Sequence, residues 1–279
     1  MKLTEACFSC LQRLIYQAVE MATDDESDRK KASEEALRTL EQHFSHDQVS
    51  IVVATKLHDA VKFHTGNPDP YSEMKRQEIA LAEALYHEMK SDYTDSLHDL
   101  AKLAVLGNTL DFFRPLDSVK KDMRRKVPFV IDDTADFEAK IRKAQKILYL
   151  ADNAGEMFFD LPLYKWMKQF SSIIYVVKAA PVQNDITMED ICSANLDTEF
   201  ENIITTGTAT PGIDFALAST EFKREFESAD LIFAKGMGYY ESLSELPAQG
   251  RFFHCLVAKC QPVADSIGVP LNSYVAMLR

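Results

Sequence analysis

The hydrophobic positions in the first 126 residues follow the spacing of helices. Steps of three and four residues place one apolar stripe on a single helix face, as at Leu3, Cys7, Cys10, Leu11 and Leu14. The same spacing returns in a later segment that stops at Gly66, and a turn at 67–70 starts another helix. A further long helix is expected from about Asp92 to Phe112. The pattern predicts five helices and no strand in this half.

After Val127 the pattern changes to short apolar runs that alternate with helical segments. Such alternation predicts right-handed crossovers and a parallel sheet with helices on both faces. The basic run 120–126 is the expected interdomain linker. The expected strands are 146–151, 173–178, 202–205, 231–234 and 252–257, and the expected helices are 156–170, 188–194, 214–229, 240–246 and 262–267.

Composition and charge exclude several classes of protein and of binding partner. The chain has 279 residues, of which 46% are hydrophobic and 27% charged, as in ordinary soluble proteins. Neither a membrane-length apolar run nor a secretory leader is recognisable, so a cytoplasmic location is expected. The net charge of −12 makes nucleic acid and membrane unfavourable partners. A small anion would still bind beside a metal ion, and a homo-oligomer is left open.

The five cysteines form no disulfide framework. One close pair, Cys7 and Cys10, lies on the apolar face of the first predicted helix. Buried thiols are favoured there. A zinc site is the alternative, and it would need two more ligands.

Polar side chains follow the predicted strands at the ends where ligands bind in an open parallel sheet. Asp152 and Asn153 follow the first strand, and Asp185 lies beyond the second. Two carboxylates and one amide oxygen form a hard, open shell that suits Mg²⁺ or Mn²⁺. Helix capping is the alternative: Asn153 would cap the helix that follows it, and Asp185 and Thr187 could equally cap a helix at Met188.

Two further features at this edge suit a phosphate. The amides near Gly155 begin a helix without intrahelical partners, and a small residue there lets a phosphate approach the backbone. Lys235 follows the fourth strand beside Gly236 and suits a phosphate oxygen as a point charge. A solvated lysine in a glycine turn is the alternative. Dinucleotide and P-loop fingerprints and the Gly-x-Ser-x-Gly elbow are missing from the sequence.

Two polar residues, Asn108 and Asp111, lie at the end of an otherwise apolar helix face. Polar groups in such a place need a partner or water. Either they make hydrogen bonds at the end of the helix, or they face the cleft between the two halves and orient metal-bound water or substrate.

Seven segments follow one another along the chain: Cys7-Phe8-Ser9-Cys10, Asp69-Pro70-Tyr71 with Lys75, Gly107-Asn108-Thr109-Leu110-Asp111, Asp152-Asn153-Ala154-Gly155-Glu156, Asn184-Asp185-Ile186-Thr187, Pro211-Gly212-Ile213-Asp214 and Lys235-Gly236-Met237-Gly238-Tyr239-Tyr240-Glu241. In this order they resemble the DUF89 family of metal-dependent damage-control phosphatases, and the resemblance covers nearly the whole chain. The Cys-x-x-Cys at the N-terminus, together with the short length, is similar to the compact prokaryotic subfamily.

The resemblance implies an α/β fold in which a helical N-terminal domain, 1–126, packs on a Rossmann-like three-layer αβα domain, 127–279. It implies a divalent ion, Mn²⁺, Ni²⁺, Co²⁺ or Mg²⁺, held by Asp152, Asn153 and Asp185. The catalytic candidates are Asp152, Glu156 and Lys235. The candidate contacts to substrate or phosphate are Asn108, Asp111, Asn153, Ala154, Gly155, Lys235 and Gly236.

The implied activity is hydrolysis of phosphate monoesters of small metabolites, such as sugar phosphates, oxidised purine nucleotides or their biosynthetic intermediates. Attack by a metal-bound water and formation of an aspartyl-phosphate on Asp152 both stay open. Two rival functions remain: a metal- and nucleotide-binding module without catalysis, and a carboxyl methyltransferase that uses S-adenosylmethionine.

Overall fold

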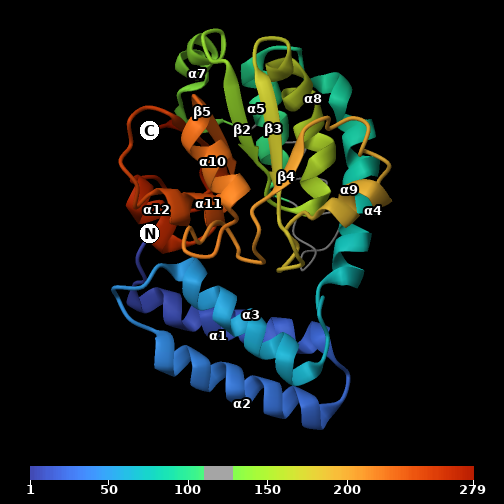
Figure 1. Ribbon diagram of the computed structural model, residues 1–279, viewed down its shortest axis with the longest axis vertical. Helices are drawn as coiled ribbons and strands as arrows, with labels where there is room; N and C mark the ends of the chain where they lie inside the picture. The colour runs from blue at the N-terminus through green and yellow to red at the C-terminus, as the bar shows by residue number, and fades with distance from the viewer. Residues whose placement is uncertain (110–127) are drawn as a thin grey trace.

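The structure is a computed structural model that describes residues 1–109 and 128–279. Figure 1 shows a layer of three helices, α1 to α3, below an α/β body, with α4 running from one to the other. None of the helices in the described ranges is long and apolar enough to cross a membrane. The helices before the sheet are α1 Glu5–Ala22, α2 Glu26–His43, α3 Ser50–Thr65, α4 Ser72–Met89, the 3₁₀ turn η1 Lys90–Asp92 and α5 Leu97–Gly107.

The sheet has seven strands in the order β1-β7-β6-β5-β2-β3-β4. All neighbouring pairs are parallel except β6 and β7. Because the chain moves from β2 to β3 on one side and later returns to β5 on the other, the strand order reverses at β2. The strands are β1 Phe129–Asp132, β2 Lys146–Leu150, β3 Ser172–Val177, β4 Ile203–Thr205, β5 Leu231–Lys235, β6 Phe252–Val257 and β7 Tyr274–Leu278.

Helices cover both faces of this sheet, which confirms the predicted α/β class. Side chains of α4, α5, α7 and α8 share one apolar core with the sheet, and α10 and α11 bury the opposite face. The α/β helices are α7 Thr134–Ile141, η2 Ala154–Glu156, α8 Met157–Lys168, α9 Met188–Ser193, α10 Thr220–Ser228, α11 Gly236–Leu243 and α12 Gln261–Ile267.

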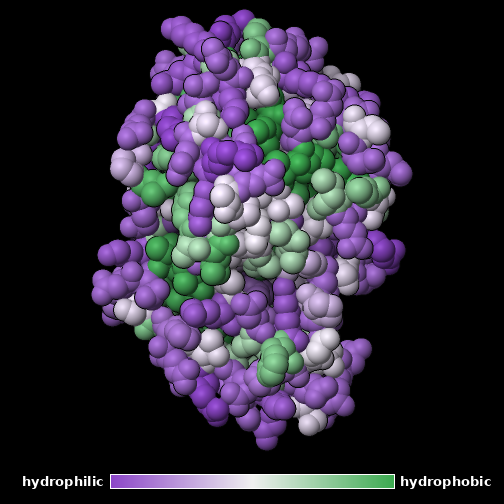
Figure 2. Space-filling model, in the orientation of Figure 1, coloured by the Kyte–Doolittle hydropathy of each residue, from purple (hydrophilic) through white to green (hydrophobic). Residues whose placement is uncertain are grey.

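The helices α1, α2 and α3 bury a separate core that includes Ile15, Ala36 and Leu57. The outer surface of this layer is hydrophilic in the lower part of Figure 2. The helices α4 and α5 instead pack on the sheet. The domain boundary expected at 126 and 127 and the linker expected at 120–126 lie outside the described residues, and both stay predictions.

Five of the seven strands were predicted from apolar runs, whereas β1 and β7 were missed. The strand β1 is a short edge strand that pairs only with β7. Its apolar run, 129–131, is three residues long, and two of its four residues are exposed, so the run is weaker than those of the central strands. The helix predicted from Asp214 begins only at Thr220, because Ser219 caps it by accepting from the Phe222 amide at 3.0 Å. The helix α11 begins earlier than predicted, at Gly236.

A buried histidine in β6 makes the stability of this fold sensitive to pH. Both ring nitrogens of His254 lack a hydrogen-bond partner among the described residues, and burial lowers the pKa of His254 from 6.5 to about 3. Below pH 6.5 His254 is therefore protonated in the unfolded chain but stays neutral in the folded chain. The stability of the folded state consequently falls as pH decreases from 6.5 towards 3. At pH 5 the loss is about 2 kcal/mol.

The variant His254→Leu isolates this contribution. Denaturant unfolding measures the free energy of unfolding of both proteins at pH 7.5 and pH 5.0. Lowering the pH should reduce this free energy by about 2 kcal/mol more in the wild type than in the variant. Equal pH dependence in the two proteins would contradict a neutral buried His254.

Candidate active site

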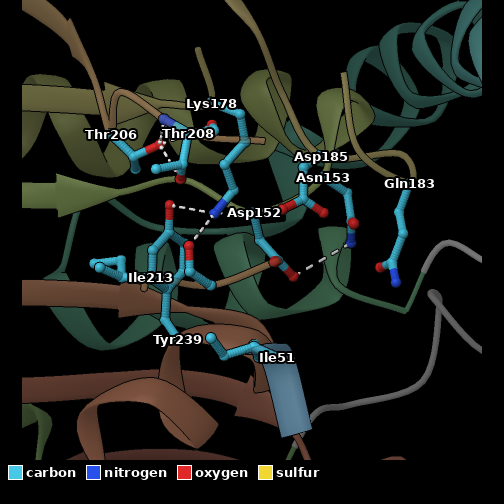
Figure 3. Close-up of polar contacts among 12 residues, drawn as sticks. Ile51, Asp152, Asn153, Lys178, Gln183, Asp185, Thr206, Thr208, Ile213 and Tyr239 are labelled. Atoms are coloured by element: carbon cyan, nitrogen blue, oxygen red, sulfur yellow. Dashed lines mark hydrogen bonds and ion pairs between the residues drawn. The ribbon is translucent and has the colours of Figure 1, made fainter. Parts of the chain in front are cut away.

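The residues after β2 lie where the strand order reverses. Asp152 and Asn153 follow β2 directly, and β2 is flanked by β3 and β5. The side chains of both residues line a cavity of about 250 Å³ between the sheet and α1. In Figure 3 their side chains lie beside that of Asp185. The position is the one expected for a ligand site in an open α/β sheet.

Asp185 reaches the same cavity from the loop after β3. An isolated antiparallel bridge pairs Asn153 with Asp185, and the Ile186 amide donates to the Asp152 carbonyl at 2.8 Å. The cap of α9 is Thr187, not Asp185, because the Thr187 hydroxyl accepts from the Asp190 amide. Asn153 likewise makes no side-chain cap. The structure therefore brings the three predicted metal ligands together and leaves them free of the capping role.

Asn108 fixes the carboxylate of Asp152 from the end of α5. Its Nδ2 donates to Asp152 Oδ2 and to Glu156 Oε1, both at 2.8 Å, and its Oδ1 accepts from the Val257 amide at 3.3 Å. Asn153 Nδ2 also donates to Glu156 Oε1, at 2.6 Å. Asn108 and Asn153 thus donate to the same buried carboxylate, that of Glu156. These hydrogen bonds set the orientation of both amides at the border of the cavity. Asp111 lies outside the described residues.

Lys235 and Glu156 form a fully buried ion pair next to this network. The Lys235 ammonium lies 2.7 Å from Glu156 Oε2 and 2.7 Å from Asp160 Oδ1, and it donates to the Ala104 carbonyl at 2.7 Å. These carboxylates raise the pKa of Lys235 above its usual value in spite of burial. Neither Lys235 nor Glu156 lines the cavity. Glu156 in turn accepts from Asn108 and Asn153, so the ion pair orients both amides from behind the cavity, and the catalytic roles expected of Lys235 and Glu156 stay predictions.

Two other lysines lie closer to the cavity. Lys178, at the end of β3, is buried, and its ammonium lies 3.4 Å from Asp185 Oδ2. It also donates to the Gly212 carbonyl at 2.7 Å and to the Tyr239 hydroxyl at 3.0 Å, as Figure 3 shows in part. Lys259 is exposed and lines the cavity itself. It is the lysine best placed to meet an anionic ligand.

The helix start at η2 is closely packed. The Ala154 amide donates to the Asn184 carbonyl at 2.8 Å and the Glu156 amide to the Asn153 carbonyl at 3.0 Å. A Cβ on Gly155 would lie 2.7 Å from Glu78 Cγ. Glycine at this position therefore leaves room for the side chain of Glu78 in α4. The phosphate-contact role predicted for Ala154 and Gly155 stays a prediction.

Several buried carboxyl groups lie close together at this site. Burial, then the charges of Glu156 and Asp185, raise the pKa of Asp152 well above its ordinary value. Burial raises the pKa of Asp185 to about 6 against the opposing effect of Lys178. It also raises the pKa of Glu78 to about 8, and Glu156 and Asp152 add to this rise. A bound cation would relieve this repulsion between carboxylates.

The donor set fits a hard divalent cation. Oδ2 of Asp185 is buried and, apart from the 3.4 Å ion pair with Lys178, has no hydrogen-bond partner among the described residues. Asp185 lines the same cavity as Asp152 and Asn153. Two carboxylates and an amide oxygen leave positions for water and substrate. No group of three or more histidine, cysteine, aspartate or glutamate side chains in the described ranges is arranged around a metal. The candidate set differs from such a group because Asn153 is its third member.

A family model matches nearly the whole chain. The damage-control phosphatase ARMT1-like domain matches residues 3–275. The chain belongs to this family. The match includes both the α1 to α3 layer and the α/β body.

Relatives within the family match along nearly their full lengths. A damage-control phosphatase of Pyrococcus horikoshii is 33% identical over 99% of this chain and 98% of its own. A damage-control phosphatase of Archaeoglobus fulgidus is 33% identical over 99% of both chains. The crystal structure of a DUF89 family protein from Pyrococcus horikoshii superposes with a TM-score of 0.91 at 31% identity, covering 100% of this chain and 99% of that one. These likenesses confirm the DUF89 resemblance and the fold.

Sequence reasoning missed the contribution of α4. Glu78 is buried there, and its Oε2 accepts from Asn184 Nδ2 at 3.0 Å. A signal was present, because Glu78 falls on the same helix face as Ala82 and Leu85, at steps of four and seven residues. A carboxylate within an apolar stripe indicates a buried charge that needs a partner.

Proposed function

We propose that this member of a phosphatase family is a divalent-metal-dependent phosphomonoesterase that hydrolyses phosphorylated small metabolites in a damage-control role. The observation that supports the proposal most is the convergence of Asp152, Asn153 and Asp185 on one cavity that Lys259 also lines. Mn²⁺, Co²⁺, Ni²⁺ and Mg²⁺ all suit this oxygen-rich set.

The three ligands would supply the oxygens that hold the metal. When bound, such an ion polarises a phosphoryl oxygen and offsets the charge of the phosphate. Asn108 holds Asp152 in one orientation through the 2.8 Å hydrogen bond to Oδ2, so the carboxylate needs little reorganisation during the reaction. Lys178, 3.4 Å from Asp185 Oδ2, opposes the rise in the pKa of Asp185 and thereby favours its ionised form. Lys259 is placed to attract the anionic substrate.

Metal removal tests this proposal directly. Treatment with EDTA should abolish release of phosphate from an aryl phosphate, and excess Mn²⁺, Co²⁺, Ni²⁺ or Mg²⁺ should restore it. Thermal unfolding should show a higher melting temperature with the bound ion, because a ligand that binds only the folded chain stabilises it. Turnover that is unchanged after complete metal removal would refute metal dependence.

The rival functions give different results in the same experiment. A binding module without catalysis would show stabilisation by metal and nucleotide and no phosphate release. A methyltransferase would transfer a labelled methyl group from S-adenosylmethionine to a carboxylate and release no phosphate from any ester.

The order of the chemical steps also has a test. If Asp152 attacks the phosphorus, acid quenching during turnover of labelled substrate traps a phosphorylated protein, with the label on residue 152. If water attacks directly, no labelled protein accumulates, and the labelled group leaves as inorganic phosphate in one step.

A further inference from the structure

A second cavity, of about 470 Å³, opens beside the candidate active site. It lies between α1 and α3 on one side and α11 and α12 on the other. Its volume falls within the usual range of small-molecule sites. Neither the metal ligands nor Asn108 border it, so the proposed metal chemistry leaves it unused.

The two cavities are neighbours with a common wall. Both are lined by Leu14, Gln183, Pro211, Met237, Gly238 and Lys259. The helix α1 runs along both, because Ala6 and Cys10 line the second cavity and Gln17 lines the first. From Ala6 to Gln17 the helix rises about 16 Å. A ligand whose phosphate lies at Asp152 and whose organic group extends past these shared residues would enter the second cavity.

The chemical character changes along this path. Acidic and amide groups surround the first cavity, whereas most of the second is apolar, with Leu3, Leu11, Ile51, Pro262 and Leu271 among its lining residues. Two of its polar groups are already engaged: the Ser50 hydroxyl donates to Glu241, and the Gln261 amide donates to Asp265 at 2.6 Å. Arg13, Gln183 and Lys259 also line it. Away from these three side chains, the hydroxyl groups of a ligand would meet mostly apolar residues, which disfavours a sugar.

We infer that this second cavity binds the organic group of the phosphate ester, an inference that rests on the proposed function. The preferred substrates then carry an apolar, ring-sized group rather than a polyhydroxylated sugar. Burial of apolar surface in the second cavity then contributes to binding and positions the ester bond beside Asp152 and Asp185.

Two esters with similar leaving groups test the inference. Ethyl phosphate and 2-phenylethyl phosphate both release a primary alcohol, so the phenyl ring is their main difference. We expect kcat/KM for 2-phenylethyl phosphate to exceed that for ethyl phosphate by at least about 10-fold, equivalent to about 1.4 kcal/mol. Glucose 6-phosphate should gain no such advantage over ethyl phosphate. The alcohol 2-phenylethanol should inhibit competitively.

The variant Ala6→Trp fills the second cavity from an exposed position of α1. It should lower kcat/KM for 2-phenylethyl phosphate about 10-fold, abolish inhibition by 2-phenylethanol and change ethyl phosphate hydrolysis less than 2-fold. Glu20→Trp is the matched control, since Glu20 is exposed on α1 and lines neither cavity.

The outcomes separate the inference from the function on which it rests. If both esters are hydrolysed with equal kcat/KM, or if Ala6→Trp slows both equally, the second cavity does not bind the organic group and the inference is overturned while the phosphatase stands. If no ester is hydrolysed with any divalent ion, the proposed function itself fails, and the inference falls with it.

Discussion

Replacement of Asp152 by alanine is expected to lower phosphatase turnover by about 10³-fold or more. The variant removes one of the three proposed metal ligands, and loss of groups that merely support such ligands already costs about 10- to 100-fold. It also removes a buried carboxylate whose pKa is raised by burial and by Glu156 and Asp185. The folded state should therefore keep its stability, or gain some, because the repulsion between carboxylates is relieved. Steady-state kinetics with an aryl phosphate and thermal unfolding measure the two effects.

Asp197→Ala is the matched control, because Asp197 is an exposed carboxylate outside the cavity. It should retain full turnover. Asp152→Asn adds a second comparison, since it keeps the shape of the side chain and removes the charge. Turnover within 10-fold of the wild type in Asp152→Ala, with Asp197→Ala unchanged, would show that the reaction does not depend on this ligand set.

The central sheet was predictable because its strands are buried on both faces. Apolar runs mark β2, β3 and β5 without any knowledge of their neighbours, and the strand order then places residues 152 and 185 at the point of reversal. The strands β1 and β7 were missed, although both contain apolar runs, 129–131 and Tyr274–Leu278. Their positions depend on pairing with each other and, for β7, on an antiparallel contact with β6, and a single apolar run does not encode such pairings.

The site residues were easier to place than their roles. Lys235 was expected to reach an anion, but its ammonium meets Glu156 and Asp160 behind the cavity. The alternation of a strand explains this direction: Lys235 points to the same side as Phe233, whose ring belongs to the core shared with α5 and α8. The role of Asn108 depends on its contacts with Asp152, Glu156 and Val257, and no local pattern specifies such tertiary contacts.

Gly236→Ala is expected to lower turnover by about 10²-fold even though residue 236 carries no reactive group. A Cβ on Gly236 would lie 1.9 Å from Oδ2 and 2.4 Å from Cγ of Asp152, so the carboxylate must move away from its hydrogen bond with Asn108. Displacement of a reacting group by about 1 Å is enough to cost about 10²-fold. The φ of +73° at this position adds backbone strain of about 1 kcal/mol for alanine.

Gly268→Ala separates backbone strain from displacement of the Asp152 carboxylate. Gly268 also has a positive φ, of +81°, but a Cβ at this position would have no atom within 4 Å. It should lose about 1 kcal/mol of stability and retain full turnover, as measured by denaturant unfolding and kinetics with the same aryl phosphate. Gly236→Ala should also bind Mn²⁺ more weakly in a calorimetric titration, because its defect lies at a proposed ligand. If Gly236→Ala matched Gly268→Ala in turnover and in affinity for the metal, the carboxylate of Asp152 would not need the orientation that the structure gives it.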